Sequence, residues 1–260
     1  MNKNLLRSVL FLASVATTQA AVVYEETFNN SGTGNANIST VGWNKYFGAT
    51  AGNPAGNEDW NSYASSVDKG GVTASDVLFL NNGATANATF AITDTSLGLA
   101  SPVSVSDITS VTWSQGNSNT AIQVRLMVQV GGSWYATNTA FTNSAVRILS
   151  DVETPVLPDV SKSFTFTTAA SSWRLLTLTP GVEMSISASA ITSDLSGNIT
   201  GVGFLVQHPA SGTNQSARFD TLQINATSSV PEPSTFALLA GLAGLGLAGA
   251  RRQTRAPKSS

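Results

Sequence analysis

Oxygen-bearing and aromatic side chains gather in the stretch GNPAGNEDWNSY, residues 52–63. Trp60 and Tyr63 carry rings that can stack on the apolar faces of sugars, while Asn57 carries an amide that can bond to sugar hydroxyl groups. The same oxygen atoms are suitable ligands for a Ca²⁺ ion. In a third interpretation the stretch is a solvated loop, and Trp60 folds back over the core. Asn57, Trp60 and Tyr63 are therefore candidate glycan-binding residues, with the other two interpretations open.

Catalytic chemistry has few residues to use. His208 is the only histidine and there is no cysteine, which excludes a multi-histidine metal site and a cysteine nucleophile. A Ser-His-Asp triad would need His208, and no G-x-S-x-G turn accompanies it. Glycoside hydrolysis requires two carboxyl groups that face each other, whereas Glu25 and Glu26 point to opposite faces of a strand. The sequence predicts a non-enzymatic protein, with a secreted glycan-active hydrolase or lyase as the alternative.

Short runs of β-branched and aromatic residues alternate with clusters of turn-forming residues along most of the chain. In residues 121–139, an alternating run ends at Gly131-Gly132, and Trp134-Tyr135 begin the return strand, which is typical of a hairpin with a two-residue turn. Residues 33–76 are expected to form a long loop with one or two strands, and residues 151–160 a second loop. The other predicted strands are residues 22–28, 77–80, 88–93, 108–113, 164–168, 173–178, 199–208 and 217–225.

These strands predict an all-β fold in residues 21–229, since no window there sustains a helical stripe. Antiparallel strands separated by frequent turns indicate a β-sandwich. Among sandwiches we expect a jelly roll, because the segment is about twice as long as one immunoglobulin domain. It also shows no internal repeat or central linker that would divide it into two domains.

The N-terminus has the order of a secretory signal peptide. Lys3 and Arg7 precede an apolar run, and the small residues Thr18 and Ala20 stand at the −3 and −1 positions of a cleavage site before Ala21. Residues 1–20 are therefore predicted to be a signal helix, and the body is predicted to be exported.

The C-terminus, residues 230–260, combines a proline-rich turn, an apolar span and a basic tail. Residues 236–250 contain no charge, and with Ser234 and Thr235 they approach the minimum length of a membrane-spanning helix. Arg251 and Arg252 follow the span, which predicts a cytoplasmic end by the positive-inside rule. The tail is thus expected to anchor the precursor in the inner membrane.

This tail resembles the PEP-CTERM sorting signal of Gram-negative bacteria. The resemblance rests on Val230, Pro231, Glu232, Pro233 and Ser234, followed by the apolar span and then by Arg251 and Arg252. It implies that an exosortase cuts the chain near the motif and that the body then reaches the cell surface or the extracellular space. It also implies a host that builds an extracellular polysaccharide matrix, as in a biofilm.

The body resembles carbohydrate-binding jelly rolls in the pattern of its first and last strands. Many such modules hold a structural Ca²⁺ between acids of these two strands, which here are Glu25 or Glu26 and Asp220. The resemblance therefore implies a calcium site as the one expected ion and no other cofactor. In the alternative interpretation, Asp220 pairs with Arg218 or caps a turn.

The body is acidic, with seven Lys and Arg against fourteen Asp and Glu in residues 21–229. Such a charge argues against a surface that follows nucleic-acid phosphates. The sequence thus predicts an exported protein, processed by exosortase, that binds extracellular polysaccharide or the cell envelope without catalysis. A purely structural matrix protein is a further alternative.

Overall fold

The computed structural model describes residues 20–28, 34–37, 42–48, 56–57, 63–66, 77–81, 88–93, 97–99, 101–144, 160–179, 183–208 and 216–227. The chain divides into two units, Ala20–Ala226 on one hand and Met1–Gln19 with Thr227–Ser260 on the other. The predicted membrane-spanning helix and sorting motif lie outside the described residues, as does the predicted signal helix apart from its last residue, Ala20, which begins the first strand. Within the described residues, no helix combines the length and the apolar character needed to cross a membrane.

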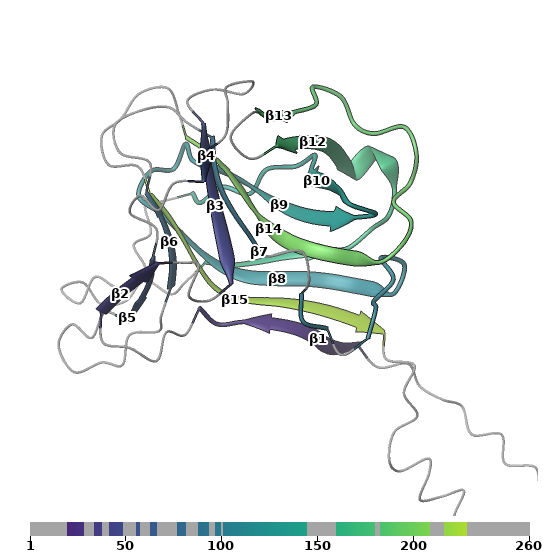
Figure 1. Ribbon diagram of the computed structural model, residues 1–260, viewed down its shortest axis with the longest axis horizontal. Coiled ribbons are helices and arrows are strands. Elements are labelled where there is room, and N and C mark those ends of the chain that lie inside the picture. Colours follow the sequence, from purple (N-terminus) through teal and green to yellow (C-terminus); the bar gives the residue numbers. More distant parts are fainter. Residues whose placement is uncertain are drawn as a thin grey trace, which may run out of the picture. The chain divides into compact units, whose positions relative to one another are not determined.

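The unit Ala20–Ala226 is all-β and contains two antiparallel sheets, drawn as separate layers in Figure 1. In spatial order, the seven-stranded sheet consists of β11 (Val160–Thr165), β8 (Ile108–Asn117), β15 (Ser216–Thr227), β6 (Val77–Asn81), β5 (Tyr63–Ser66) and β2 (Gly34–Asn37), with β1 (Ala20–Glu26) also paired to β15. The eight-stranded sheet consists of β13 (Glu183–Ile186), β12 (Trp173–Thr179), β10 (Ser133–Thr137), β9 (Gln123–Val130), β14 (Ile199–Gln207), β7 (Ala88–Thr93), β3 (Trp43–Gly48) and β4 (Gly56–Asn57). One short 3₁₀ turn, η2 (Ala170–Ser172), precedes β12.

The predicted hairpin is confirmed in β9 and β10. Ser133 pairs with Val130, so that only Gly131 and Gly132 form the connection. Their φ angles are 58° and 80°, a left-handed conformation that glycine adopts without steric cost. As in any strand, alternate residues of β9 point to opposite faces of the eight-stranded sheet.

The main core lies between the two sheets. Val111, Trp113 and Phe219 reach it from the seven-stranded sheet, and Leu126 and Phe204 reach it from the eight-stranded sheet. The rings of Phe204 and Phe219 stack with their centroids 4.0 Å apart, and Trp113 lies 5.6 Å from Phe204. These contacts across the layers show that the sheets pack face to face as a sandwich.

The other face of the eight-stranded sheet, called the outer face below, carries a second apolar cluster. Met127, Trp134 and Leu205 are buried there, on the strand positions that alternate with those of the main core. Gly201 of β14 makes room for the Trp134 ring, because a Cβ at this glycine would lie 2.6 Å from Trp134 Cη2.

The expectation for residues 33–76 was wrong in one respect. The structure places four strands there, β2, β3, β4 and β5, where one or two were expected. Three of them have at most four residues, too short for an alternating pattern to stand out in the sequence. β13 was not expected either, and β11 begins at Val160, before the apolar run that predicted it. Residues 151–159 of the second predicted loop lie outside the described residues.

Candidate functional site

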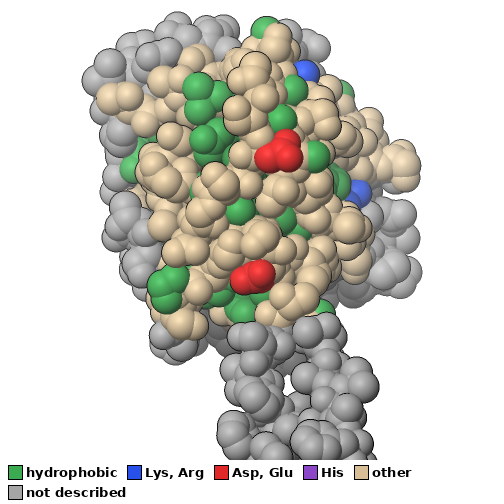
Figure 2. Space-filling model, turned by 90° about the vertical axis from the view of Figure 1, so that its right-hand side faces the viewer, with side chains coloured by type: hydrophobic (Ala, Val, Ile, Leu, Met, Phe, Trp, Pro, Cys, Tyr) green, Lys and Arg blue, Asp and Glu red, His purple; other side chains and the backbone are tan. Residues whose placement is uncertain are grey.

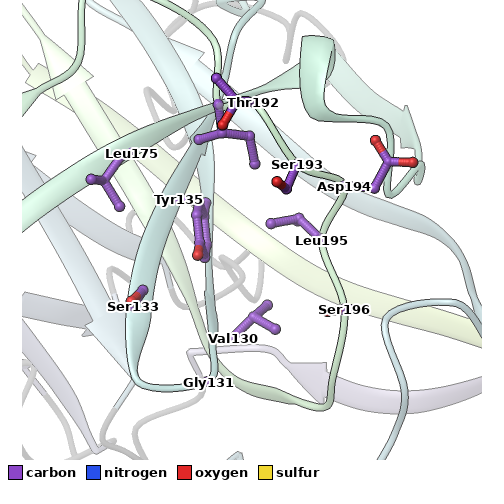
Figure 3. Close-up of a pocket in the computed structure, with 11 residues that line it drawn as sticks. Val130, Gly131, Ser133, Tyr135, Leu175, Thr192, Ser193, Asp194, Leu195 and Ser196 are labelled. Carbon is purple, nitrogen blue, oxygen red and sulfur yellow. The ribbon is translucent and has the colours of Figure 1, made fainter.

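An open pocket of about 460 Å³ lies beside β10 and β12, under the segment 187–198 that joins β13 to β14 (Figure 3). Its size falls within the ~300–1,000 Å³ range that is usual for small-ligand sites. It is lined by Val130, Gly131, Ser133, Tyr135, Leu175, Ile191, Thr192, Ser193, Asp194, Leu195 and Ser196.

Two strands provide the apolar wall of this pocket. Tyr135 of β10 pairs directly with Leu175 of β12, so both side chains lie on the same face of the sheet. In Figure 3 the Tyr135 ring stands between its strand and the segment 187–198. Leu175 is 43% exposed, which is unusual for a large apolar side chain within a strand. The wall therefore offers an aromatic ring and an aliphatic side chain to a ligand.

Backbone hydrogen bonds fix the segment that forms the opposite wall. The amides of Ser187 and Ile191 donate to carbonyl groups of β12, both at 2.9 Å, and the amide of Leu195 donates to Thr168 O at 2.8 Å. Gly197 O accepts from the amide of Val105 at 2.9 Å. Asp194 Oδ1 accepts from the amide of Ala170, at the start of η2, at 2.8 Å. Because the segment is held along its length, the pocket is preformed.

The polar lining consists mostly of hydroxyl groups. Ser133, Thr192, Ser193 and Ser196 line the pocket, and Asp194 is the only acid among the described lining residues. Figure 2 shows a face of the molecule on which charged side chains are few and lie apart. A ring, an aliphatic side chain and hydroxyl groups suit an uncharged polyhydroxyl ligand such as a sugar. Glycoside hydrolysis uses two facing carboxyl groups, and the described lining contributes one, that of Asp194.

Two of the predicted glycan-binding residues, Asn57 and Tyr63, belong to strands that do not line this pocket. Asn57 ends β4 of the eight-stranded sheet, whereas Tyr63 begins β5 of the seven-stranded sheet. Trp60 lies outside the described residues, as do the side chains of Asn57 and Tyr63. Their role in binding stays a prediction.

The predicted calcium ligands have protein partners or are buried. Glu25 is exposed, and its Oε1 accepts from Gln223 Nε2 of β15 at 2.8 Å. Glu26 Oε1 accepts from the amide of Phe28 at 2.7 Å. Asp220 is buried in β15, where the pairing with β8 becomes irregular. Among the described residues, no group of three or more His, Asp or Glu side chains is arranged to hold a metal ion. The calcium site stays a prediction.

Tyr24 adds a titratable group next to Glu26. Burial raises the pKa of the Tyr24 hydroxyl well above its usual value, and the negative charge of Glu26 raises it further. The neighbouring Trp43 side chain acts in the opposite direction and lowers this pKa, although the buried Trp43 indole N–H has no hydrogen-bond partner within the described residues. Tyr24 therefore stays protonated in the folded protein.

Sequence reasoning missed the pocket at Tyr135 and Leu175. The hydroxyl-rich segment 187–198, SASAITSDLSGN, resembles the many other Ser- and Thr-rich turns of this chain, so its composition does not distinguish it. Leu175 gave no clear signal either, because it shares a face of β12 with the buried Trp173 and looks like a core residue in the sequence.

Comparison with known proteins identifies the tail. Residues 229–253 match the model of the PEP-CTERM protein-sorting motif. The chain thus carries this motif, which confirms the resemblance seen in the sequence and implies an exported protein that exosortase processes. No curated protein sequence matches the chain significantly.

A distantly similar solved structure comes from work on endo-acting O-glycanases that prominent members of the human gut microbiota express to initiate mucin breakdown. The identity is 10%, and the match covers 80% of this chain and 100% of that chain. The TM-score of 0.36 marks a similarity too distant to bear on function.

Proposed function

We propose that this exported, exosortase-processed protein is a non-enzymatic binding module for extracellular polysaccharide or glycans of the cell envelope. The observation that carries the proposal is the preformed pocket between Tyr135, Leu175 and the hydroxyl-rich segment 187–198. Within the proposal, the ring and the leucine contact the apolar face of a sugar, while the hydroxyl groups and Asp194 bond to its hydroxyl groups.

The module itself is proposed to be a jelly roll, and its strand order supports this. Along the chain, β6, β7, β8, β9, β10, β11, β14 and β15 lie in the two sheets as β11-β8-β15-β6 and β10-β9-β14-β7. This is the interleaved order produced by two Greek keys. β12 and β13 extend the second sheet beyond β10, and they carry Leu175 and the start of the segment over the pocket. The extra strands thus build the site.

The tail is proposed to hold the precursor in the inner membrane until exosortase cuts near Val230–Ser234. Pro231 and Pro233 keep this stretch extended, which suits the cleft of a protease. The processed body would then act at the cell surface or in the extracellular matrix. Exosortase, extracellular polysaccharide and, before cleavage, the membrane are therefore the proposed partners.

The pocket is tested with the full-length protein, kept in detergent because of its apolar tail. We expect retention on one or more immobilised polysaccharides or arrayed glycans, with no release of shorter sugars. Tyr135→Ala should weaken binding about 10-fold, as the loss of about 1.5 kcal/mol of ring contact would do. Tyr135→Phe should bind nearly as well as the parent, because it keeps the ring.

The matched control is Val22→Ala, which removes an exposed large apolar side chain in β1 without touching the pocket. Equal loss in Tyr135→Ala and Val22→Ala would contradict the pocket assignment. Release of shorter sugars would instead support a hydrolase or lyase. Absence of both binding and cleavage would favour a structural matrix protein.

A further inference from the structure

Two arginines lie close together on the outer face of the eight-stranded sheet. Ala136 of β10 pairs with Met127 on one side and with Arg174 of β12 on the other. Arg125 precedes Met127 by two residues and therefore points to the same face of β9. Asn138, two residues after Ala136, binds both arginine side chains.

Neutral acceptors hold both guanidinium groups in place. Arg125 Nη1 donates to the carbonyl oxygens of Thr137, at 2.8 Å, and of Asn138. Arg125 Nε donates to Gln207 Oε1 at 3.2 Å, and Arg174 Nε donates to Asn138 Oδ1 at 2.6 Å. These bonds leave the Nη2 group of Arg125 and both Nη groups of Arg174 without a hydrogen bond in the described part of the chain. Donors are thus available in fixed positions.

The local charge is unbalanced. Neither Arg125 nor Arg174 has an acidic partner among the described residues. Burial lowers the pKa of Arg125, and the positive charge of Arg174 lowers it further. Two like charges held together destabilise each other, and an anion between them would relieve this repulsion. The feature contrasts with a body that has twice as many acidic as basic residues.

We propose that Arg125 and Arg174 form a binding site for the carboxylate groups of an acidic polysaccharide. A guanidinium group presents paired donors that match the two oxygens of a carboxylate, so a uronic acid residue fits this site. The inference rests on the proposed glycan-binding function and narrows its ligand to an anionic polymer. The site lies on the outer face of the sheet, whereas Tyr135 of the pocket belongs to the residues that pack on the main core.

The test compares polygalacturonate with its methyl-esterified form, which has the same backbone but no negative charge. Binding of the full-length protein in detergent is measured at low and at moderate salt. We expect preference for the charged polymer, which salt weakens. Arg174→Gln should reduce affinity for polygalacturonate about 10-fold, the usual effect of losing a charge-assisted hydrogen bond. The affinity of Arg174→Lys should lie between those of the parent and of Arg174→Gln, because lysine keeps the charge but loses the paired donors.

Lys162→Gln is the matched control, since it removes one positive charge from β11 of the other sheet. It should leave the affinity within about twofold. Equal losses in Arg174→Gln and Lys162→Gln would overturn the site in favour of general charge attraction. Binding to the neutral polymer without preference for the charged one would overturn the inference alone. Failure to bind any polysaccharide or arrayed glycan would remove the proposed function as well. Melting curves check that each variant folds. If Arg174→Gln does not fold, the affinity of Arg174→Lys for polygalacturonate is used to test the site.

Discussion

Gly201 allows β14 to pass beneath Trp134, and replacing it with alanine should destabilise the protein. The new Cβ would lie 2.6 Å from Trp134 Cη2, 3.2 Å from Cζ2 and 3.1 Å from Gln129 Cβ. Contacts this short force the indole ring to move. Trp134 is only 8% exposed, so the ring has little room to move into. Overpacking of this kind costs about 1–3 kcal/mol. For a domain of this size, each kcal/mol lowers the melting temperature by roughly 2–4 °C.

The assay is equilibrium urea unfolding followed by far-UV circular dichroism, which does not depend on the tryptophan signal. A double-mutant cycle with Trp134→Phe isolates the contact, since phenylalanine lacks the ring atoms that the Cβ would approach. We expect Gly201→Ala to cost at least about 1 kcal/mol less in the Trp134→Phe background than in the parent.

Gly197→Ala is the comparison variant. Its φ of 113° disfavours a side chain, whereas the nearest atom to its Cβ, Val130 Cγ1, lies at an ordinary 3.6 Å. Its cost should therefore come from the backbone and stay the same in both backgrounds. If Gly201→Ala is as costly with phenylalanine as with tryptophan at position 134, the contact argument is wrong.

Three further measurements test other parts of the structure. Folded Tyr24 holds its proton more tightly than the unfolded chain does, so stability should be fully present below pH ~10 and fall above it; Tyr24→Phe should flatten this fall in urea unfolding between pH 8 and 11, and an unchanged fall would contradict the burial argument. If the carboxylates of β1 and β15 share Ca²⁺, a chelator should lower the melting temperature relative to millimolar Ca²⁺; identical curves would remove the calcium site. Protein isolated from its host should begin at Ala21 and lack the apolar tail by intact mass, and a retained tail would exclude processing by exosortase.

The longer strands of the second half could be predicted because their runs of apolar and β-branched residues are long, whereas the four-residue β13 was missed. β9 alternates apolar with mostly polar residues, β14 is a nearly continuous apolar run, and the glycine pair between β9 and β10 defines the turn chemically. The short strands of residues 33–76 could not be predicted, because Gly34–Asn37 and Gly56–Asn57 lie in sheets through backbone pairing that their side chains do not signal.

The candidate sites were harder to predict than the fold. Tyr135 and Leu175 become neighbours only through the register of β10 with β12, and Arg125 and Arg174 only through the pairing of β9, β10 and β12. Nothing in the spacing of these residues along the chain indicates either pairing. By contrast, the sorting motif is a local sequence signal, read without a fold, and the sequence alone was sufficient to find it.

The position of β15 in the seven-stranded sheet ties folding to export. This strand pairs with β8, β6 and β1, yet it is the last strand in the described part of the chain and ends at Thr227, two residues before the sorting motif begins. A chain that crosses the membrane from its N-terminus must therefore deliver nearly all of its length before the sheet can close. Until then β8 and β6 present open edges, which are prone to pairing with other chains. Once β15 is in place, about 10 Å of extended chain at most separates it from Val230. The exosortase would therefore have to bind its cleavage motif close to the surface of a folded domain.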